Sequence, residues 1–109
     1  MTALKATFEN LPIGPDGSAK FNVGLMLSAE TSSADSSVSG GYVRAAIRPM
    51  TATNRALYAA MINAFDVGAD KGNGGASSLT MAEAYRYLAG IAAYSGNNKA
   101  KADYAGNTA

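Results

Sequence analysis

The chain contains no histidine, no cysteine and no tryptophan. Histidine is the side chain whose ordinary pKa lies near neutral pH, so the most common general base is missing, and a Ser-His-Asp triad is excluded. Without cysteine the chain can form no disulfide or zinc–thiolate site, and it has no thiolate nucleophile. These absences remove most of the catalytic chemistry open to a short protein. We predict that the chain is not an enzyme and uses no cofactor or metal.

Charged residues and long apolar runs are also scarce. Charged residues make up 16% of the chain and the formal net charge is +1, whereas a typical soluble domain is about 25% charged. No apolar run approaches the roughly 18 residues that suggest a membrane span. The N-terminus lacks the basic and apolar regions of a signal peptide. We therefore expect a protein that is cytoplasmic when synthesised and has no membrane partner.

The apolar content is large in number but small in volume. Hydrophobic residues reach 48% of the 109 residues, yet many of them are alanine, which buries little area. A chain of this length is expected to form a single domain over residues 1–109. Its core is predicted to be thin. Either a partner subunit supplies part of the burial, or close alanine and glycine contacts hold a compact monomer.

The first half of the sequence is typical of strands. Leu4, Ala6 and Phe8 alternate with polar residues, as in a half-buried strand, and a second alternating run begins near residue 19. Pro15-Asp16-Gly17 is a turn signal between these two runs, which favours an antiparallel hairpin. Proline at position 49 ends a third run. The predicted strands cover about residues 3–9, 19–28 and 42–48.

The second half is typical of helices. Apolar residues at helical spacing predict a helix over about 53–67, with Thr51 or Thr53 as N-cap, and Leu57, Ala60, Met61, Ala64 and Phe65 inward. Thr80 and Glu83 match a capping box, so a second helix is predicted over about 81–95, ended by Gly96. Its expected inner stripe includes Met81, Tyr85 and Leu88. The fold class is therefore α+β, a small antiparallel three-stranded sheet packed by two C-terminal helices.

Three segments have little to bury: the Ser-rich stretch 28–41, the Gly-rich stretch 68–78 and the polar tail 97–109. A loop as long as 28–41 is usually functional or disordered. It is either solvated or ordered against a neighbouring subunit or ligand. The Gly-rich stretch does not have the spacing of a P-loop or a dinucleotide-binding motif, and its preceding element is expected to be helical. We interpret it as a connector between helices.

One predicted sheet face carries an aromatic ring and bases. Tyr42, Arg44 and Arg48 share a face of the third strand, and Lys20 and Arg55 are candidates to join them. Bases of single-stranded nucleic acid stack on aromatic rings, while arginine neutralises phosphate. These five residues form a candidate site for RNA or single-stranded DNA. The alternative is an ordinary solvated sheet face.

The second predicted helix carries a further apolar face. Tyr87, Ile91 and Tyr94 lie outside the expected inner stripe, and tyrosine is common at interfaces because its ring is apolar and its tip polar. We interpret these three residues as a candidate subunit interface. The alternative is that both faces of a central helix are core.

These features together favour a structural protein that associates with itself. The thin core, the open sheet edges and the low charge are typical of a coat, cement or decoration protein of a bacteriophage virion. The order of elements, strands and then two helices, is similar to that of coat proteins of small single-stranded RNA phages. Expected partners are further copies, other virion proteins and the genome. The alternatives are a single-stranded nucleic-acid-binding protein and a small phage-encoded inhibitor of a host system.

Overall fold

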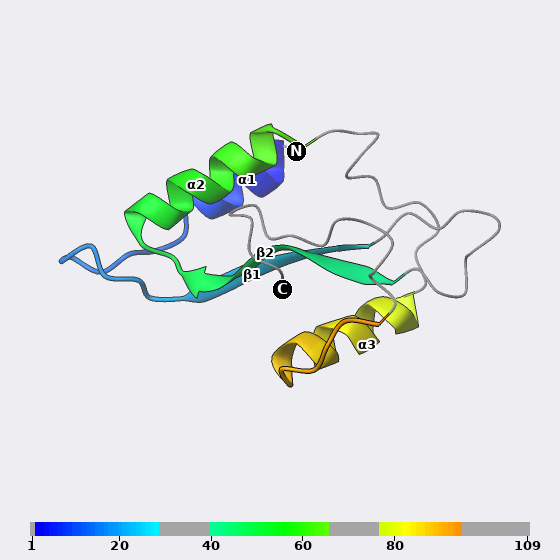
Figure 1. Cartoon of the computed structure of the whole chain (residues 1–109). Coiled ribbons are helices and arrows are strands. Elements are labelled where there is room, and N and C mark those ends of the chain that lie inside the picture. The colour runs from blue at the N-terminus through cyan, green and yellow to red at the C-terminus, as the bar shows by residue number, and fades with distance from the viewer. Residues whose placement is uncertain (1, 29–39, 66–76, 95–109) are drawn as a thin grey trace. The chain divides into compact units, whose positions relative to one another are not determined.

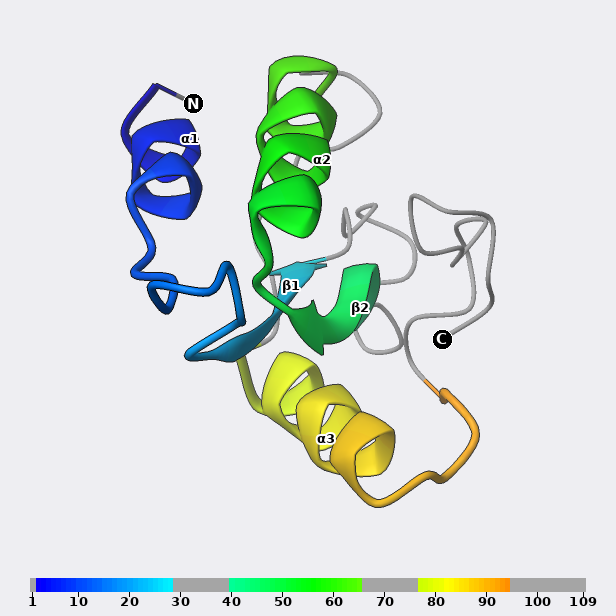
Figure 2. The same cartoon turned by 90° about the vertical axis from the view of Figure 1, so that its left-hand side faces the viewer.

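The computed structural model describes residues 2–28, 40–65 and 77–94, which form two strands and three helices (Figures 1 and 2). In chain order the elements are α1 (Thr2–Glu9), β1 (Asn22–Ser28), β2 (Gly41–Pro49), α2 (Ala52–Asn63) and α3 (Ser77–Leu88). β1 and β2 pair in an antiparallel, two-stranded sheet. The α+β class is confirmed, but the predicted three-stranded sheet with two C-terminal helices is wrong.

The chain divides into two compact units. The first comprises Met1–Gly24 and Ala46–Phe65, and the second comprises Leu25–Ala45 and Asp66–Ala109. Both strands contribute residues to both units. The single domain expected from the sequence stays a prediction, and each unit is described below by itself. Most of the segment 28–41, most of 68–78 and the whole tail 97–109 lie outside the described residues.

The segment predicted as the first strand, residues 3–9, is instead helix α1. Alternating apolar residues at 4, 6 and 8 also place Leu4 and Phe8 four residues apart, which is helical spacing. Alanine at positions 3 and 6 has the highest helix propensity, and Lys5 pairs with Glu9 one turn later. Phe8 is the one residue of α1 that is buried. The helix therefore has one buried side chain and good local propensity. Because the chain begins with a helix, the likeness in element order to the phage coat proteins is lost.

The turn signal at 15–17 is correct, but the turn closes only a short bridge. Ile13 and Ala19 form an isolated antiparallel bridge, and Gly17 adopts a φ of 80°, which glycine tolerates without strain. Asp16 accepts a hydrogen bond from the Ser18 backbone N–H at 3.0 Å. Hydrogen bonds from the side chain and backbone of Ser18 lower the pKa of Asp16. The predicted hairpin between residues 3–9 and 19–28 does not form, and β1 pairs with β2.

The core of the first unit lies where α1 and α2 run side by side, as Figures 1 and 2 show. The Phe8 and Tyr58 rings meet edge-on, with centroids 5.3 Å apart. Tyr58, Met50 and Ile62 are the largest side chains that are fully buried. The Tyr58 hydroxyl donates toward the carbonyl oxygens of Val23, at 3.2 Å, and of Ala46. One side chain of α2 thus bonds to a backbone carbonyl on each strand.

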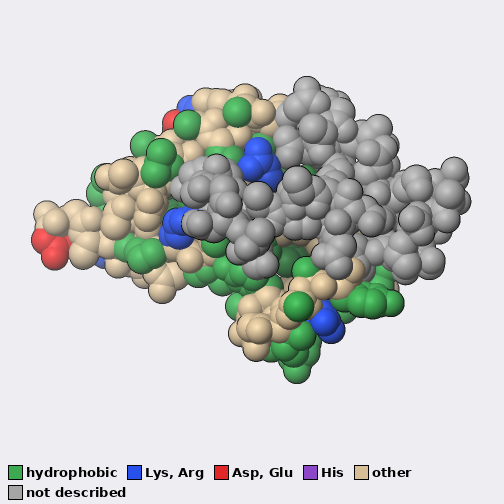
Figure 3. Space-filling model, in the orientation of Figure 1, with side chains coloured by type: hydrophobic (Ala, Val, Ile, Leu, Met, Phe, Trp, Pro, Cys, Tyr) green, Lys and Arg blue, Asp and Glu red, His purple; other side chains and the backbone are tan. Residues whose placement is uncertain are grey.

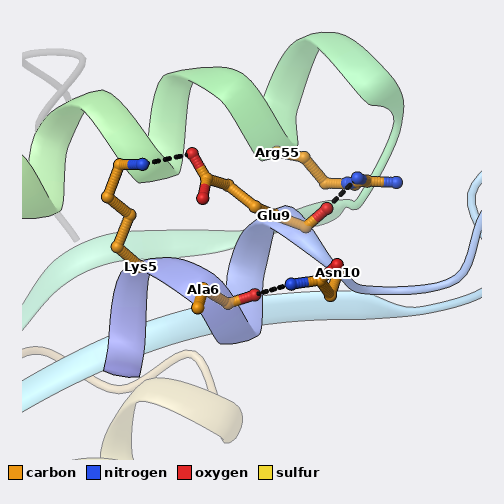
Figure 4. Close-up of polar contacts among 5 residues, drawn as sticks. All are labelled: Lys5, Ala6, Glu9, Asn10 and Arg55. Carbon is orange, nitrogen blue, oxygen red and sulfur yellow. Dashed lines mark hydrogen bonds and ion pairs between the residues drawn. The ribbon is translucent and has the colours of Figure 1, made fainter. Parts of the chain in front are cut away.

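Polar contacts hold the end of α1 against α2, as Figure 4 shows. The Arg55 guanidinium on α2 donates to the carbonyl oxygen of Glu9, the last residue of α1. A cation is favourable there because the C-terminal carbonyls of a helix carry partial negative charge. The Asn10 side-chain amide donates to the carbonyl oxygen of Ala6 at 2.8 Å. These bonds satisfy backbone carbonyls that the end of the helix leaves without helical partners.

α2 begins as predicted but presents a different face to the core. Thr51 is the N-cap, and its hydroxyl accepts a hydrogen bond from the Asn54 N–H at 3.2 Å. The residues that α2 buries are Tyr58, Ala59, Met61 and Ile62, whereas Leu57 is 45% exposed. Of the residues expected inward, Met61 is buried, whereas Leu57 and Ala60 are exposed, so the buried face differs from the expected face by about one residue. Tyr58, Met61 and Ile62 also have helical spacing. With this face inward, the Tyr58 hydroxyl reaches the carbonyl oxygens of Val23 and Ala46.

Candidate functional site

In the second unit, α3 buries a glutamate and exposes three large apolar side chains. Glu83 is the one residue of this helix that is buried, at 4% exposure. Thr80, Ala84 and Tyr87 are half-buried and share its face at helical spacing. Met81, Tyr85 and Leu88 are 69%, 67% and 73% exposed. The expected inward orientation of these three residues is therefore wrong.

The start of α3 explains part of this orientation. The helix begins at Ser77, so Thr80 lies within its first turn and the predicted capping box with Glu83 is wrong. Thr80 instead approaches the first residue of β2. A Cβ added to Gly41 would lie 2.9 Å from the Thr80 methyl carbon and 2.9 Å from the Met26 sulfur. Gly41 thus allows a helix face with a small side chain to lie close to the strand.

The end of α3 is a Schellman motif, which fixes the segment that follows. The Gly90 N–H donates to the Tyr87 carbonyl at 3.2 Å, and the Ile91 N–H donates to the Arg86 carbonyl at 2.8 Å. Gly90 has a φ of 68°, the left-handed conformation that this motif requires. The helix therefore ends at Leu88 rather than near 95, and Gly90 takes the role that the sequence suggested for Gly96. Gly96 itself lies outside the described residues.

After this motif the chain folds back along the inward side of α3. The Tyr94 N–H donates to the Glu83 carboxylate at 2.9 Å. The Arg86 side chain donates to the Ala92 carbonyl at 2.7 Å, and its guanidinium lies 5.9 Å from the centroid of the Tyr94 ring. We call residues 90–94 the return segment. This segment supplies one hydrogen bond to the buried Glu83 carboxylate.

The return segment, α3 and the paired strands line a partly open cavity of about 260 Å³ in the second unit. Met26, Tyr42 and Val43 line it from the strands, Glu83 and Tyr87 from α3, and Ile91, Ala92 and Ala93 from the return segment. Two glycines, Gly41 and Gly90, complete the lining. Glu83 is the single charged side chain among these residues. The cavity is therefore apolar and aromatic, with one carboxylate in its wall.

The outer side of α3 is an apolar surface. We call Met81, Tyr85 and Leu88 the α3 outer face, because they are separated by four and three residues and lie on one side of the helix. Figure 3 shows hydrophobic side chains gathered on the exposed surface of α3. Ile91 and Tyr94 in the return segment are also exposed, at 44% and 66%. Large exposed apolar side chains therefore lie both on the α3 outer face and in the return segment.

The predicted interface residues Tyr87, Ile91 and Tyr94 lie at the inner side and the end of α3. Tyr87 and Ile91 line the cavity. Tyr94 is exposed, and its ring is paired with Arg86. The sequence predicted an interface at Tyr87, Ile91 and Tyr94. In the structure, the most exposed apolar side chains are those of the α3 outer face. Whether Tyr87, Ile91 and Tyr94 contact another subunit stays a prediction.

The structure distributes the predicted nucleic-acid residues over both units. Tyr42 is 5% exposed and lines the cavity, and Arg44 lies beside it on β2, half-buried. In the first unit, Arg48 donates to the Tyr58 hydroxyl at 3.4 Å and Arg55 bonds to α1. Lys20 is exposed. The structure therefore gives the arginines at 48 and 55 structural contacts, and the nucleic-acid site stays a prediction.

Sequence reasoning missed the cavity and the buried carboxylate. Glu83 was explained by its place in a capping box, and a single glutamate on a helix carries no signal that it is buried. Gly90 was a detectable signal, because a glycine after Tyr87-Leu88-Ala89 can take the C′ role. Because α3 ends at Leu88 and not near residue 95, residues 90–94 are free of the helix and form the return segment that lines the cavity.

Within the described residues there is no group of three or more acidic, histidine or cysteine side chains that could hold a metal ion. No helix in the described part of the chain has the length and apolar character to cross a membrane. Comparison with known proteins identifies no relative, because no protein-family model, no curated protein and no solved structure matches the chain.

Proposed function

We propose that this protein acts as a small structural protein that associates with copies of itself through the α3 outer face. The observation that carries the proposal is the reversed orientation of α3. A surface helix normally turns its apolar stripe to the core and its charges to water. In α3 the one acid is buried, and three large apolar side chains are more than two-thirds exposed. A partner that covers this face would remove the cost of its exposure.

A second copy of the chain fits this face because the face is uncharged and regular. Met81, Tyr85 and Leu88 repeat the four-and-three spacing of a coiled-coil seam. Two such helices can pack about a two-fold axis, so that each residue meets its equivalent or a neighbour. Because none of the three is charged, the paired faces bring no like charges together. The low charge of the whole chain agrees with such an interface.

The size of the face indicates a weak interface when it acts alone. A tyrosine side chain can bury about 150 Å² or more, so three large side chains offer roughly several hundred Å². A standard stable interface buries about 800 Å² on each partner. We therefore expect association that depends on protein concentration. In the described part of the chain each strand has one side with no strand neighbour, and such edges can extend an interface by pairing.

The virion protein predicted from the sequence is a specific form of this proposal. In that form, self-association builds or decorates a closed particle, and negative-stain electron microscopy would show shells, rings or filaments. The single-stranded nucleic-acid-binding alternative is less favoured, since Tyr42 is buried and two of its arginines bond within the protein. Inhibition of a host system remains a prediction.

The experiment is sedimentation velocity over a wide range of protein concentration, with the double variant Met81→Gln/Leu88→Gln. Glutamine keeps a high helix propensity, so the change removes apolar surface without unfolding α3. We expect wild type to form dimers or larger species as its concentration rises. We expect the double variant to need at least about tenfold more protein for the same degree of association, which corresponds to about 1.4 kcal/mol.

The matched control is Leu57→Gln. Leu57 is also a helical leucine, on α2, and it is 45% exposed. The control should associate as wild type does. A wild type that stays monomeric at millimolar concentration would contradict the proposal, and so would a double variant that associates like wild type.

A further inference from the structure

Met81 brings a thioether to the α3 outer face, and the residue is 69% exposed. The chain has five methionines and no cysteine, so methionine is its only sulfur-containing side chain. We propose that Met81 is a site of oxidation by hydrogen peroxide, and that conversion of its thioether to the sulfoxide weakens self-association through the α3 outer face. The inference rests on the proposed function, because it concerns the regulation of the same surface.

Exposure distinguishes Met81 from the other methionines that the structure describes. Met50 is 0% exposed and Met61 is 6% exposed, and both belong to the core of the first unit. Met26 is half-buried on β1 and lines the cavity of the second unit. Peroxide must reach a sulfur atom to react with it, so oxidation follows exposure. We therefore expect Met81 to be oxidised before the other three.

The reaction requires only the thioether and the peroxide. A lone pair of the Met81 sulfur attacks one oxygen of hydrogen peroxide, which forms the S–O bond and breaks the O–O bond. The sulfur is oxidised by two electrons, and the peroxide takes up both. The departing hydroxide removes the proton of the new S–OH group, so the products are the sulfoxide and one water molecule. The side chain thereby changes from a flexible apolar group to a polar, chiral one.

The position of Met81 in the face makes association sensitive to this change. Met81 begins the four-and-three spacing that it shares with Tyr85 and Leu88, so pairing of two copies through this face removes it from water. Removal of a sulfoxide oxygen from water costs free energy that a thioether does not incur. A two-fold interface contains Met81 from both copies, so two sulfoxides enter it together. Oxidation therefore favours the separate copies.

The same coupling acts in the opposite direction. Paired copies cover Met81, so association should slow its reaction with peroxide. The face is small and its association depends on protein concentration, so separate copies with an accessible Met81 are present in the equilibrium and can react. Association and oxidation of Met81 therefore oppose each other, and each can be measured without the other.

The experiment compares wild type with Met81→Leu, each before and after treatment with hydrogen peroxide. Leucine has nearly the volume and the helix propensity of methionine but no sulfur, so the variant keeps an apolar α3 outer face. It also keeps every other methionine, including Met1, which lies outside the described residues, and so it reports the effect of oxidation elsewhere. Peptide mass spectrometry assigns the oxidised residues, and sedimentation velocity measures association.

We expect the two untreated proteins to associate alike. After treatment, wild type should need at least about tenfold more protein for the same degree of association, whereas Met81→Leu should change by less than about twofold. At a fixed excess of peroxide, oxidation of Met81 should become slower as the wild-type concentration is raised into the associated range.

Three results would overturn the inference: oxidation of Met26, Met50 or Met61 before Met81, treated wild type that associates like untreated wild type, or a loss of association in treated Met81→Leu equal to that in wild type. A rate of Met81 oxidation that is the same in dilute and in associated protein would overturn it as well. Wild type that stays monomeric before treatment contradicts the proposed function and this inference together. Failure confined to the treated samples contradicts this inference alone.

Discussion

α2 and α3 are both 12 residues long, yet they use their apolar residues in opposite ways. α2 buries an aromatic ring, a methionine and an isoleucine, and its inward face contacts α1. α3 buries a glutamate and exposes a methionine, a tyrosine and a leucine. α2 obtains its stability from packing within the first unit. α3 leaves Met81, Tyr85 and Leu88 exposed to solvent.

Polar groups differ between the two helices as well. In α2 the Thr51 hydroxyl caps the first turn and the Tyr58 hydroxyl bonds to the strands. In the described part of the chain, each helix also has one buried polar atom without a hydrogen-bond partner, Arg55 Nε on α2 and the Thr80 hydroxyl on α3. Native structures contain few such groups, because each one costs free energy. The two helices therefore differ in their satisfied polar contacts, with Thr51 and Tyr58 on α2 and Glu83 on α3, and not in the number of buried polar atoms left without a partner among the described residues.

Truncation of one apolar side chain on each helix gives the largest expected difference. Ile62→Ala on α2 removes a side chain that is 1% exposed, so we expect the free energy of unfolding to fall by about 2–5 kcal/mol. Leu88→Ala on α3 removes one that is 73% exposed, and we expect a change within about 0.5 kcal/mol. Urea denaturation followed by circular dichroism measures both.

These measurements must use protein dilute enough to be monomeric, because association would add apparent stability to wild type. Under that condition, a loss of about 2 kcal/mol or more in Leu88→Ala would show that the α3 outer face is part of a core. The contrast between the helices would then fail.

Removal of one hydroxyl from each helix gives the next effect in size. Tyr58→Phe leaves the ring in place and removes the donor to the Val23 and Ala46 carbonyls, so we expect a loss of about 1–3 kcal/mol. Tyr85→Phe changes a side chain that is 67% exposed, and its hydroxyl exchanges only contacts with water. We expect no change beyond about 0.5 kcal/mol in that control. Equal losses in the two variants would contradict the difference in burial.

The sequence predicted those elements whose signals are local. The turn at Pro15-Asp16-Gly17, the N-cap Thr51 and the approximate extents of β1 and β2 were correct, because each depends on a few neighbouring residues. Residues 3–9 were wrong because alternation and helical spacing coincide over so short a segment. Local propensity and the Lys5–Glu9 pair stabilise the helix. A two-residue period is a weak signal when it rests on three apolar positions.

The orientation of the helices could not be obtained from the sequence. Two sets of residues at helical spacing exist on α2 and two on α3, and the choice depends on long-range bonds. Tyr58 is turned inward by carbonyls on both strands, and Glu83 by the N–H of Tyr94. The cavity also depends on the end of α3 at Leu88, followed by Gly90, and on the chain folding back after it. Hydrophobic periodicity contains no information on these contacts.

Exchange of one threonine on each helix gives the smallest expected effect, and it distinguishes a capping hydroxyl from a buried unpaired one. Thr51→Ala removes the acceptor for the Asn54 N–H, which should lower the free energy of unfolding by about 1 kcal/mol. Thr80→Val replaces an unpaired hydroxyl with a methyl group of nearly the same shape. Because no hydrogen bond is lost and the cost of burying a polar group is removed, stability should be unchanged or rise by about 1 kcal/mol. A destabilisation by Thr80→Val comparable to that of Thr51→Ala would mean that the Thr80 hydroxyl has a bonding role, as the capping box predicted from the sequence required. If Thr51→Ala lowers the free energy of unfolding and Thr80→Val does not, the Thr80 hydroxyl is not the N-cap of α3.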